Sequence, residues 1–219
     1  MPTLMNGNNF LLKRRKSTNT LQITYFCRNL NKPEMTKRPL ILVTNDDGIT
    51  APGIRTLIKV MNTIGDVVVV APDSPQSAMG HAITINDTLY CKKEHIDDGP
   101  QTEYSSSGTP ADCVKLAVHE LLDRKPDLCV SGVNHGSNSS VNVIYSGTMS
   151  AAIEAGMEGV PAIGFSLLDY NWEADFSQIE SFIKTITLQV LTQGLQKGII
   201  LNVNFPKLLE TDIKGIRVS

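Results

Sequence analysis

Short apolar runs alternate with amphipathic stretches along most of the chain. Each apolar run lacks polar alternation and ends in turn-forming residues, which is typical of strands buried on both faces of a parallel sheet. Between them, apolar side chains recur at helical spacing. The expected strands are residues 40–44, 67–71, 103–107, 128–131, 162–166 and 199–203, and the expected helices are 52–62, 111–122, 149–157 and 176–191. This alternation predicts an α/β fold with a mainly parallel, doubly wound sheet.

The segments between these elements are less regular. Residues 82–92 alternate only in part, so we expect a hairpin or an excursion from the main sheet. Residues 74–80 and 132–142 are polar and read as loops. Residues 215–219 resemble the beginning of a strand, which suggests that the chain is a fragment.

The first 34 residues differ in composition from the rest. Their six basic residues precede the first acidic residue, Glu34. We expect a disordered leader or a start codon assigned too early, because Met35 stands just before the first strand. Composition alone also allows a transit-like peptide. The predicted domain organisation is therefore a leader, 1–34, and a single folded domain, 35–219.

Overall composition narrows the classes of partner. The chain is 41% hydrophobic and carries a formal net charge of -2. A protein that binds the phosphate backbone of nucleic acid is usually basic, so we expect no nucleic-acid partner. An aromatic content of 5% also argues against a platform for stacking bases. No apolar stretch approaches the length of a membrane span, so no membrane partner is expected.

Four cysteines, Cys27, Cys91, Cys113 and Cys129, lack the C-x-x-C spacing of zinc or redox sites. Cys113 and Cys129 lie in apolar runs, where cysteine is usually a small buried residue. This pattern fits a reducing compartment.

Oxygen-bearing side chains follow several of the expected strands. Asp46 and Asp47 come directly after the first strand, Ser77 follows the second, and Asn134 follows the strand at 128–131. In an open α/β sheet, ligands bind beyond the carboxyl ends of the strands. Adjacent carboxylates repel, and a divalent cation removes that cost. An all-oxygen set suits Mg²⁺, Mn²⁺ or Ca²⁺. A turn or a helix cap would also explain these residue types.

A second candidate is the start of the helix at 149–157. Ser146, Gly147 and Thr148 precede it, and free N–H groups at a helix start favour a phosphate. Thr109 stands at the start of another expected helix and is a candidate for the same site. The alternative for both is an ordinary N-cap. His135 closely follows Asn134 and is a candidate lining residue.

Taken together, these residues resemble the SurE family of stationary-phase survival nucleotidases from about residue 39 onward. The shared segments are T-N-D-D-G at 44–48, A-P-G-I at 51–54, V-A-P-D at 70–73, G-T-P-A-D-C at 108–113, S-G-V-N at 131–134, Y-S-G-T at 145–148 and A-A-I-E-A-G at 151–156. Each segment alone is modest, and their joint order is specific.

The resemblance implies a Rossmann-like, three-layer fold and hydrolysis of nucleoside 5′-monophosphates, and often 3′-monophosphates. It implies one divalent cation per subunit, Mg²⁺ or Mn²⁺, held by Asp46, Asp47, Ser77 and Asn134. The two aspartates are then the catalytic residues, with Asp46 favoured for orienting or deprotonating the attacking water. Asn45, Thr109, Ser146, Gly147 and Thr148 are the expected contacts to phosphate or substrate.

Family members are usually cytoplasmic homodimers or homotetramers, in which a C-terminal arm helps to build the oligomer. That arm would begin beyond Ser219, so the oligomer is a less secure expectation for this chain. Three alternatives differ in function. A receiver-type signalling module lacks its phospho-acceptor Asp and its Lys here, and a P-loop ATPase lacks its G-x-x-x-x-G-K motif. A nucleotide-binding protein without catalysis remains open.

Overall fold

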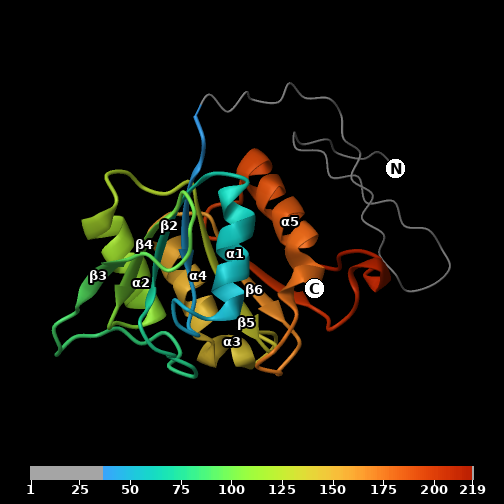
Figure 1. Ribbon diagram of the computed structural model, residues 1–219, viewed down its shortest axis with the longest axis horizontal. Helices are drawn as coiled ribbons and strands as arrows, with labels where there is room; N and C mark the ends of the chain where they lie inside the picture. Colours follow the sequence, from blue (N-terminus) through green and yellow to red (C-terminus); the bar gives the residue numbers. More distant parts are fainter. Residues whose placement is uncertain (1–36, 219) are drawn as a thin grey trace, which may run out of the picture. The chain divides into compact units, whose positions relative to one another are not determined.

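A computed structural model of the chain describes residues 37–218 (Figure 1). Residues up to Ile213 belong to one compact unit. The expected leader, 1–34, lies outside the described residues. The last described element is the 3₁₀ turn η3, Glu210–Asp212, and residues 213–218 contain no strand. The expectation of a strand beginning at residue 215 was therefore wrong for the residues that are described.

The unit is built on a seven-stranded sheet with the order β3-β4-β2-β1-β5-β6-β7. All neighbouring strands run parallel except β3 and β4, which are antiparallel. The strands are β1 Leu40–Thr44, β2 Asp66–Pro72, β3 Cys91–Glu94, β4 Thr102–Ser106, β5 Leu128–His135, β6 Ala162–Leu167 and β7 Leu201–Phe205. The mainly parallel sheet confirms the predicted fold class.

Helices cover both faces of this sheet, which makes three layers (Figure 1). α1 and α5 pack on one face, and α2 and α4 pack on the other. The α-helices are α1 Pro52–Asn62, α2 Pro110–Leu116, α3 Asn142–Tyr145, α4 Gly147–Met157 and α5 Glu180–Gln193. α2 continues as a π-helical turn, η1 Ala117–Leu121, and a 3₁₀ turn, η2 Phe176–Ile179, leads into α5.

The central strand shows why the apolar runs lack alternation. Ile41 and Val43 of β1 pack in the cluster with α1 and α5, whereas Leu42 packs in the cluster with α2 and α4. All three side chains are fully buried. Successive residues of a strand point to opposite faces, so a strand covered on both sides must be apolar at every position. Burying these side chains is the main favourable contribution to folding.

One strand differs from the sequence-based expectation, and one alternative that the sequence left open is resolved. β5 does not end at Ser131 but continues to His135, because pairing with β6 resumes at Asn134 after a shift in register. Of the segment 82–92, expected as a hairpin or an excursion from the sheet, residues 91 and 92 begin β3, and residues 82–90 make the excursion. They pass over α2, where both the N–H and the hydroxyl of Thr84 donate to the Asp112 carboxylate.

The expected strand at 199–203 lies two residues later, as β7. The shift arises because Ile199 closes a turn by donating its N–H to the carbonyl of Gln196.

Within residues 37–218, no helix is both long and apolar enough to cross a membrane.

Candidate active site

The carboxyl ends of the parallel strands meet at one edge of the sheet, here called the carboxyl edge. β1 lies between β2 and β5, so the loop that follows it is central on this edge. That loop carries Asn45, Asp46 and Asp47. Asn134 stands near the end of the neighbouring strand β5, and the N-terminus of α4 approaches the same loop. The residues predicted from separate segments are therefore gathered at the topological switch of the sheet.

Asp46 is buried and is held by the first turn of α4. Only 4% of Asp46 is exposed, and its Oδ1 accepts a 2.5 Å hydrogen bond from the Thr148 hydroxyl. Burial raises the pKa of Asp46, and hydrogen bonds from the Thr148 side chain and from the Thr148 and Gly147 N–H groups act in the opposite direction. The helix start thus stabilises the ionised carboxylate that burial disfavours.

Gly147 is required by the close approach of the Asp46 side chain. A Cβ placed on Gly147 would lie 2.6 Å from the Asp46 Cβ and 2.9 Å from its Oδ2. Neither atom can move far, because the Asp46 Cβ is attached to the backbone and its carboxylate is held by Thr148. The glycine of the Y-S-G-T segment therefore lets the helix start contact Asp46 directly.

Asp47 is the more accessible member of the pair. Burial and, after it, the negative charge of Asp46 raise its pKa from 3.8 to about 7, although a hydrogen bond from the His135 N–H acts in the opposite direction. Within residues 37–218, neither carboxylate forms an ion pair with a basic side chain. Two adjacent, poorly solvated carboxylates therefore lack a protein counter-charge.

Asn45 is oriented by one hydrogen bond and keeps one buried oxygen without a partner. Its Nδ2 donates to the Gly48 carbonyl at 2.8 Å, while its buried Oδ1 accepts no hydrogen bond. The hydroxyls of Thr44 and Ser131, on paired positions of β1 and β5, also lack partners within the described residues. Buried polar atoms without partners are rare, so these three oxygens are candidates for contact with a bound cation or ligand.

Asn134 has its amide turned in a defined direction. Its Nδ2 donates to the carbonyls of His135 and Gly136 and to Oδ1 of Asn138, at 3.1, 3.4 and 3.1 Å. With the nitrogen so engaged, the Asn134 Oδ1 forms no hydrogen bond within residues 37–218. This is the orientation in which an amide oxygen can serve as a cation ligand.

Ser77 is exposed on a segment that is tied to the site through its neighbours. The Gln76 N–H donates to the Asp46 carbonyl at 2.7 Å, and the Gly80 N–H donates to the Tyr145 carbonyl at 3.3 Å. The Ser77 hydroxyl itself forms no hydrogen bond within the described residues. Its backbone is thus held beside Asp46 while its side chain stays available.

The expected phosphate-binding residues act here as structural caps or as Asp46 contacts. Ser146 is the N-cap of α4 and accepts from the Met149 N–H. Thr109 caps α2 in a reciprocal pair with Asp112, and its hydroxyl donates to the Ala82 carbonyl at 2.7 Å. In the structure, Ser146 and Thr109 therefore act as N-caps, and the hydroxyl of Thr148 donates its hydrogen bond to Asp46.

Sequence reasoning missed an anchor for the segment that carries Ser77. His81 Nε2 lies 2.7 Å from the Glu154 carboxylate of α4, and Lys115 pairs with the same carboxylate at 3.2 Å. The Glu154 side chain is 6% exposed. The A-A-I-E-A-G segment contained the signal, because a carboxylate among small apolar residues of a packed helix needs a partner.

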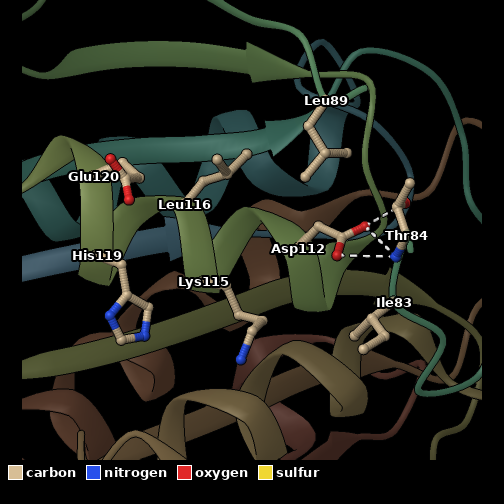
Figure 2. A pocket seen from close by; sticks show the side chains of 8 residues that line it. All are labelled: Ile83, Thr84, Leu89, Asp112, Lys115, Leu116, His119 and Glu120. Atoms are coloured by element: carbon tan, nitrogen blue, oxygen red, sulfur yellow. Dashed lines mark hydrogen bonds between the residues drawn. The ribbon is translucent and has the colours of Figure 1, made fainter. Parts of the chain in front are cut away.

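The structure also contains a hollow of about 240 Å³ that is separate from the acidic pair. Figure 2 shows that it lies along α2 and η1, with Ile83, Thr84 and Leu89 of the preceding segment completing its lining. Its polar lining includes Asp112 and Lys115. The Asp112 carboxylate already accepts a hydrogen bond from the Thr84 hydroxyl, and Lys115 forms an ion pair with Glu154. None of the predicted site residues lines this hollow.

The fold defines a three-layer, Rossmann-like α/β protein whose carboxyl edge carries an acidic pair and several side-chain oxygens. The family model described as "Survival protein SurE" matches residues 41–219. The chain belongs to the SurE family.

Similar proteins agree with this assignment. The chain is 72% identical over 182 residues to a protein named 5′-nucleotidase SurE from Flavobacterium johnsoniae, covering 83% of this chain and 70% of the relative. It is 71% identical over 183 residues to one of the same name from Christiangramia forsetii, again covering 83% and 70%. Among solved structures, the SurE protein from Aquifex aeolicus is 39% identical, with a TM-score of 0.74 over 82% of this chain and 71% of that one.

Proposed function

We propose that the chain is a metal-dependent 5′-nucleotidase that hydrolyses nucleoside 5′-monophosphates, and also 3′-monophosphates, to nucleoside and phosphate. The name 5′-nucleotidase SurE, borne by relatives 71–72% identical, supports the reaction class. The observation that carries the proposal is the pair formed by the buried Asp46 and the partly buried Asp47, which has no basic partner among the described residues. Two such carboxylates favour the binding of a cation, and a cation bound at the carboxyl edge would attract the negatively charged phosphate of a substrate.

The donor set fits one hard divalent cation. Asp46 and Asp47 supply the charge, and Ser77 and Asn134 supply neutral oxygens. Residues 37–218 contain no cluster of three or more His, Cys, Asp or Glu side chains that could hold a metal. Oxygen ligands with few charges suit Mg²⁺ or Mn²⁺, which retain water and bind substrate phosphates. The free orientation of the Asn134 Oδ1 and the orphaned oxygen of Asn45 support this fit.

The residues of the chain divide the remaining tasks. A bound cation supplies charge neutralisation for the phosphoryl oxygens in the transition state. Thr148 and the N–H groups of α4 keep Asp46 ionised and fixed. A water molecule attacks phosphorus and its proton passes toward Asp47 instead of Asp46, the residue favoured from the sequence, because Asp47 is the more accessible of the two. The bond from phosphorus to the ester oxygen breaks, and that oxygen leaves as the hydroxyl of the nucleoside after taking up a proton.

The assignment of the phosphate contacts is narrower than the sequence suggested. We assign Gly147 and Thr148 to holding Asp46, so that the positive end of α4 acts on the phosphate through the carboxylate it orients. Ser146 and Thr109 keep the helix starts in place. Asn45 lies in the loop after β1, and its buried Oδ1 accepts no hydrogen bond within residues 37–218. The cytoplasmic location and the homo-oligomer stay predictions.

Phosphate release from a panel of nucleoside monophosphates tests the proposal. Release should require Mg²⁺ or Mn²⁺, stop with EDTA, and fall by several orders of magnitude in Asp46→Asn and Asp47→Asn. Asp73→Asn, which changes an exposed aspartate after β2, is the matched control and should retain activity. Binding of nucleotide by a folded protein that releases no phosphate under any condition would favour the alternative, a nucleotide-binding protein without catalysis.

A further inference from the structure

Two exposed aromatic side chains stand on the loop that follows β6, at the carboxyl edge. Tyr170 is 75% exposed and Trp172 is 68% exposed. Trp172 is the chain's single tryptophan. Leaving a large indole in water forgoes the favourable free energy of burying it, so two such rings on one loop need a reason.

Each ring is supported from one side by the end of β5. The indole of Trp172 stacks on the imidazole of His135, with centroids 5.6 Å apart and planes at 17°. The His135 ring is in turn held edge-on by Phe176, at 5.0 Å and 76°. The Tyr170 hydroxyl accepts from the Ser137 N–H at 3.3 Å, and its ring lies over Gly136. Each ring is therefore held by protein contacts on one side and exposed to solvent on the other.

This support connects Trp172 to the acidic pair through one residue. His135 directly follows Asn134, a proposed cation ligand, and the His135 N–H hydrogen-bonds to Asp47. The Asn134 side chain therefore belongs to the candidate cation site, and the side chain of the next residue, His135, contacts the indole. Trp172 is thus linked to the candidate cation site through His135, at the same end of β5.

We propose that the open face of Trp172 is the stacking platform for the base of the nucleotide, with Tyr170 beside it. The proposal rests on the nucleotidase function proposed above and names the part of that site that recognises the nucleoside. Every base has a flat π face, and stacking on an aromatic side chain is tolerant of sequence. Purines offer the larger face, so purine monophosphates are preferred. The low aromatic content of the chain is compatible with this role, because one ring is enough for a mononucleotide.

The first test compares substrates with and without a base. Trp172→Ala should raise KM for AMP by about tenfold or more, which is about 1.4 kcal/mol or more of binding. It should leave kcat/KM for ribose 5-phosphate, which has no base, within about twofold. Trp172→Phe should restore most of the loss. Tyr90→Ala is the matched control, because Tyr90 is 73% exposed just before β3, at the other end of the sheet.

The second test needs no turnover. Trp172 is the only indole, so the tryptophan fluorescence of the wild-type protein reports on this position alone. AMP should quench it in a saturable manner, whereas ribose 5-phosphate should not. The thermal midpoint of each variant, expected to stay near the wild-type value, shows that the fold is retained.

Three outcomes would overturn the proposal. Equal losses for AMP and ribose 5-phosphate in Trp172→Ala would show that the indole acts only by supporting His135. Unchanged KM for AMP together with no quenching would show that no base lies there. A fluorescence change in the wild-type protein that follows protein concentration without AMP, together with self-association that light scattering detects in the wild type and not in Trp172→Ala, would assign the face to a second copy of the chain. If the wild-type protein releases no phosphate at all, the nucleotidase proposal fails, and quenching by AMP still decides whether the base site exists.

Discussion

The Thr148 hydroxyl donates a 2.5 Å hydrogen bond to Oδ1 of Asp46, across 102 positions of sequence. Both residues are buried, so the bond is shielded from water. A buried carboxylate oxygen that loses its donor pays the cost of desolvation without compensation. The orientation of Asp46 in the active site therefore depends on a side chain of α4.

Replacing Thr148 tests this dependence. Thr148→Val keeps the shape and removes the donor, so it should lower the free energy of unfolding by about 1–3 kcal/mol and reduce kcat about tenfold or more. Thr148→Ser keeps the hydroxyl and should retain most of the activity. Denaturant unfolding and phosphate release measure the two effects. Equal activity in the valine and serine variants would show that the hydrogen bond is dispensable.

Gly147→Ala should disable the site by displacing Asp46. The added methyl would lie 2.6 Å from the Asp46 Cβ, so either the carboxylate or the helix start must move. Overpacking of this kind costs about 1–3 kcal/mol of stability, and activity should fall by at least two orders of magnitude. Gly156→Ala, in the same helix, meets only a side-chain methyl of Ile200 and is the control. Comparable activity losses in both variants would refute the specific role of Gly147.

The pKa of Asp47 predicts a pH dependence for the cation-free protein. Because burial and the charge of Asp46 raise this pKa from 3.8 to about 7, the folded state binds the proton more tightly than the unfolded chain. The resulting stabilisation is fully present below pH 3.8 and is lost as the pH rises to about 7. Over this window, Asp47→Asn should show a smaller fall in thermal midpoint than the wild-type protein.

A bound cation should restore the stability that is lost when Asp47 ionises, because it neutralises the carboxylate in place of the proton. The increase in thermal midpoint on adding Mn²⁺ should be larger at pH 8 than at pH 6 in the wild-type protein and should nearly disappear in Asp47→Asn. Asp73→Asn should behave like the wild type. Equal increases at both pH values would mean that Asp47 does not compete for protons and cation.

His81 should contribute to cation affinity through the segment that carries Ser77. Its contact with the buried Glu154 holds residues 74–84 against α4. In His81→Ala, the Mn²⁺ concentration needed for half-maximal activity should rise several-fold, with kcat at saturating Mn²⁺ changed little. His119→Ala is the control, because His119 pairs with Glu158 at 3.0 Å and is half exposed. A similar change in both variants would argue for a general charge effect.

Most of the fold and the centre of the site could be predicted from the sequence because their signals are local. A run such as residues 40–44 is apolar throughout only if both of its faces are covered, and Asp46 and Asp47 follow its end directly. The extension of β5 to His135 could not be predicted, since a polar, glycine-containing stretch gives no sign that pairing resumes. The role of Thr148 was also hidden, because its hydroxyl could serve a phosphate, a cap or a distant carboxylate equally well.

The remaining differences arise from contacts between distant segments. His81 contacts Glu154, and Trp172 contacts His135, only after the sheet has brought the loops together. Spacing along the sequence carries no information on such pairs. They were accordingly absent from the predicted site.

The placement of β1 at the middle of the sheet has a consequence for biosynthesis. β1 pairs on one side with β2 and on the other with β5, and the Leu40 N–H reaches the Asp127 carboxylate 87 positions later. Contacts of such long sequence separation close late and slow the folding of a chain. The nascent polypeptide emerging from the ribosome therefore acquires both aspartates early but cannot assemble a working site until α4 has been synthesised.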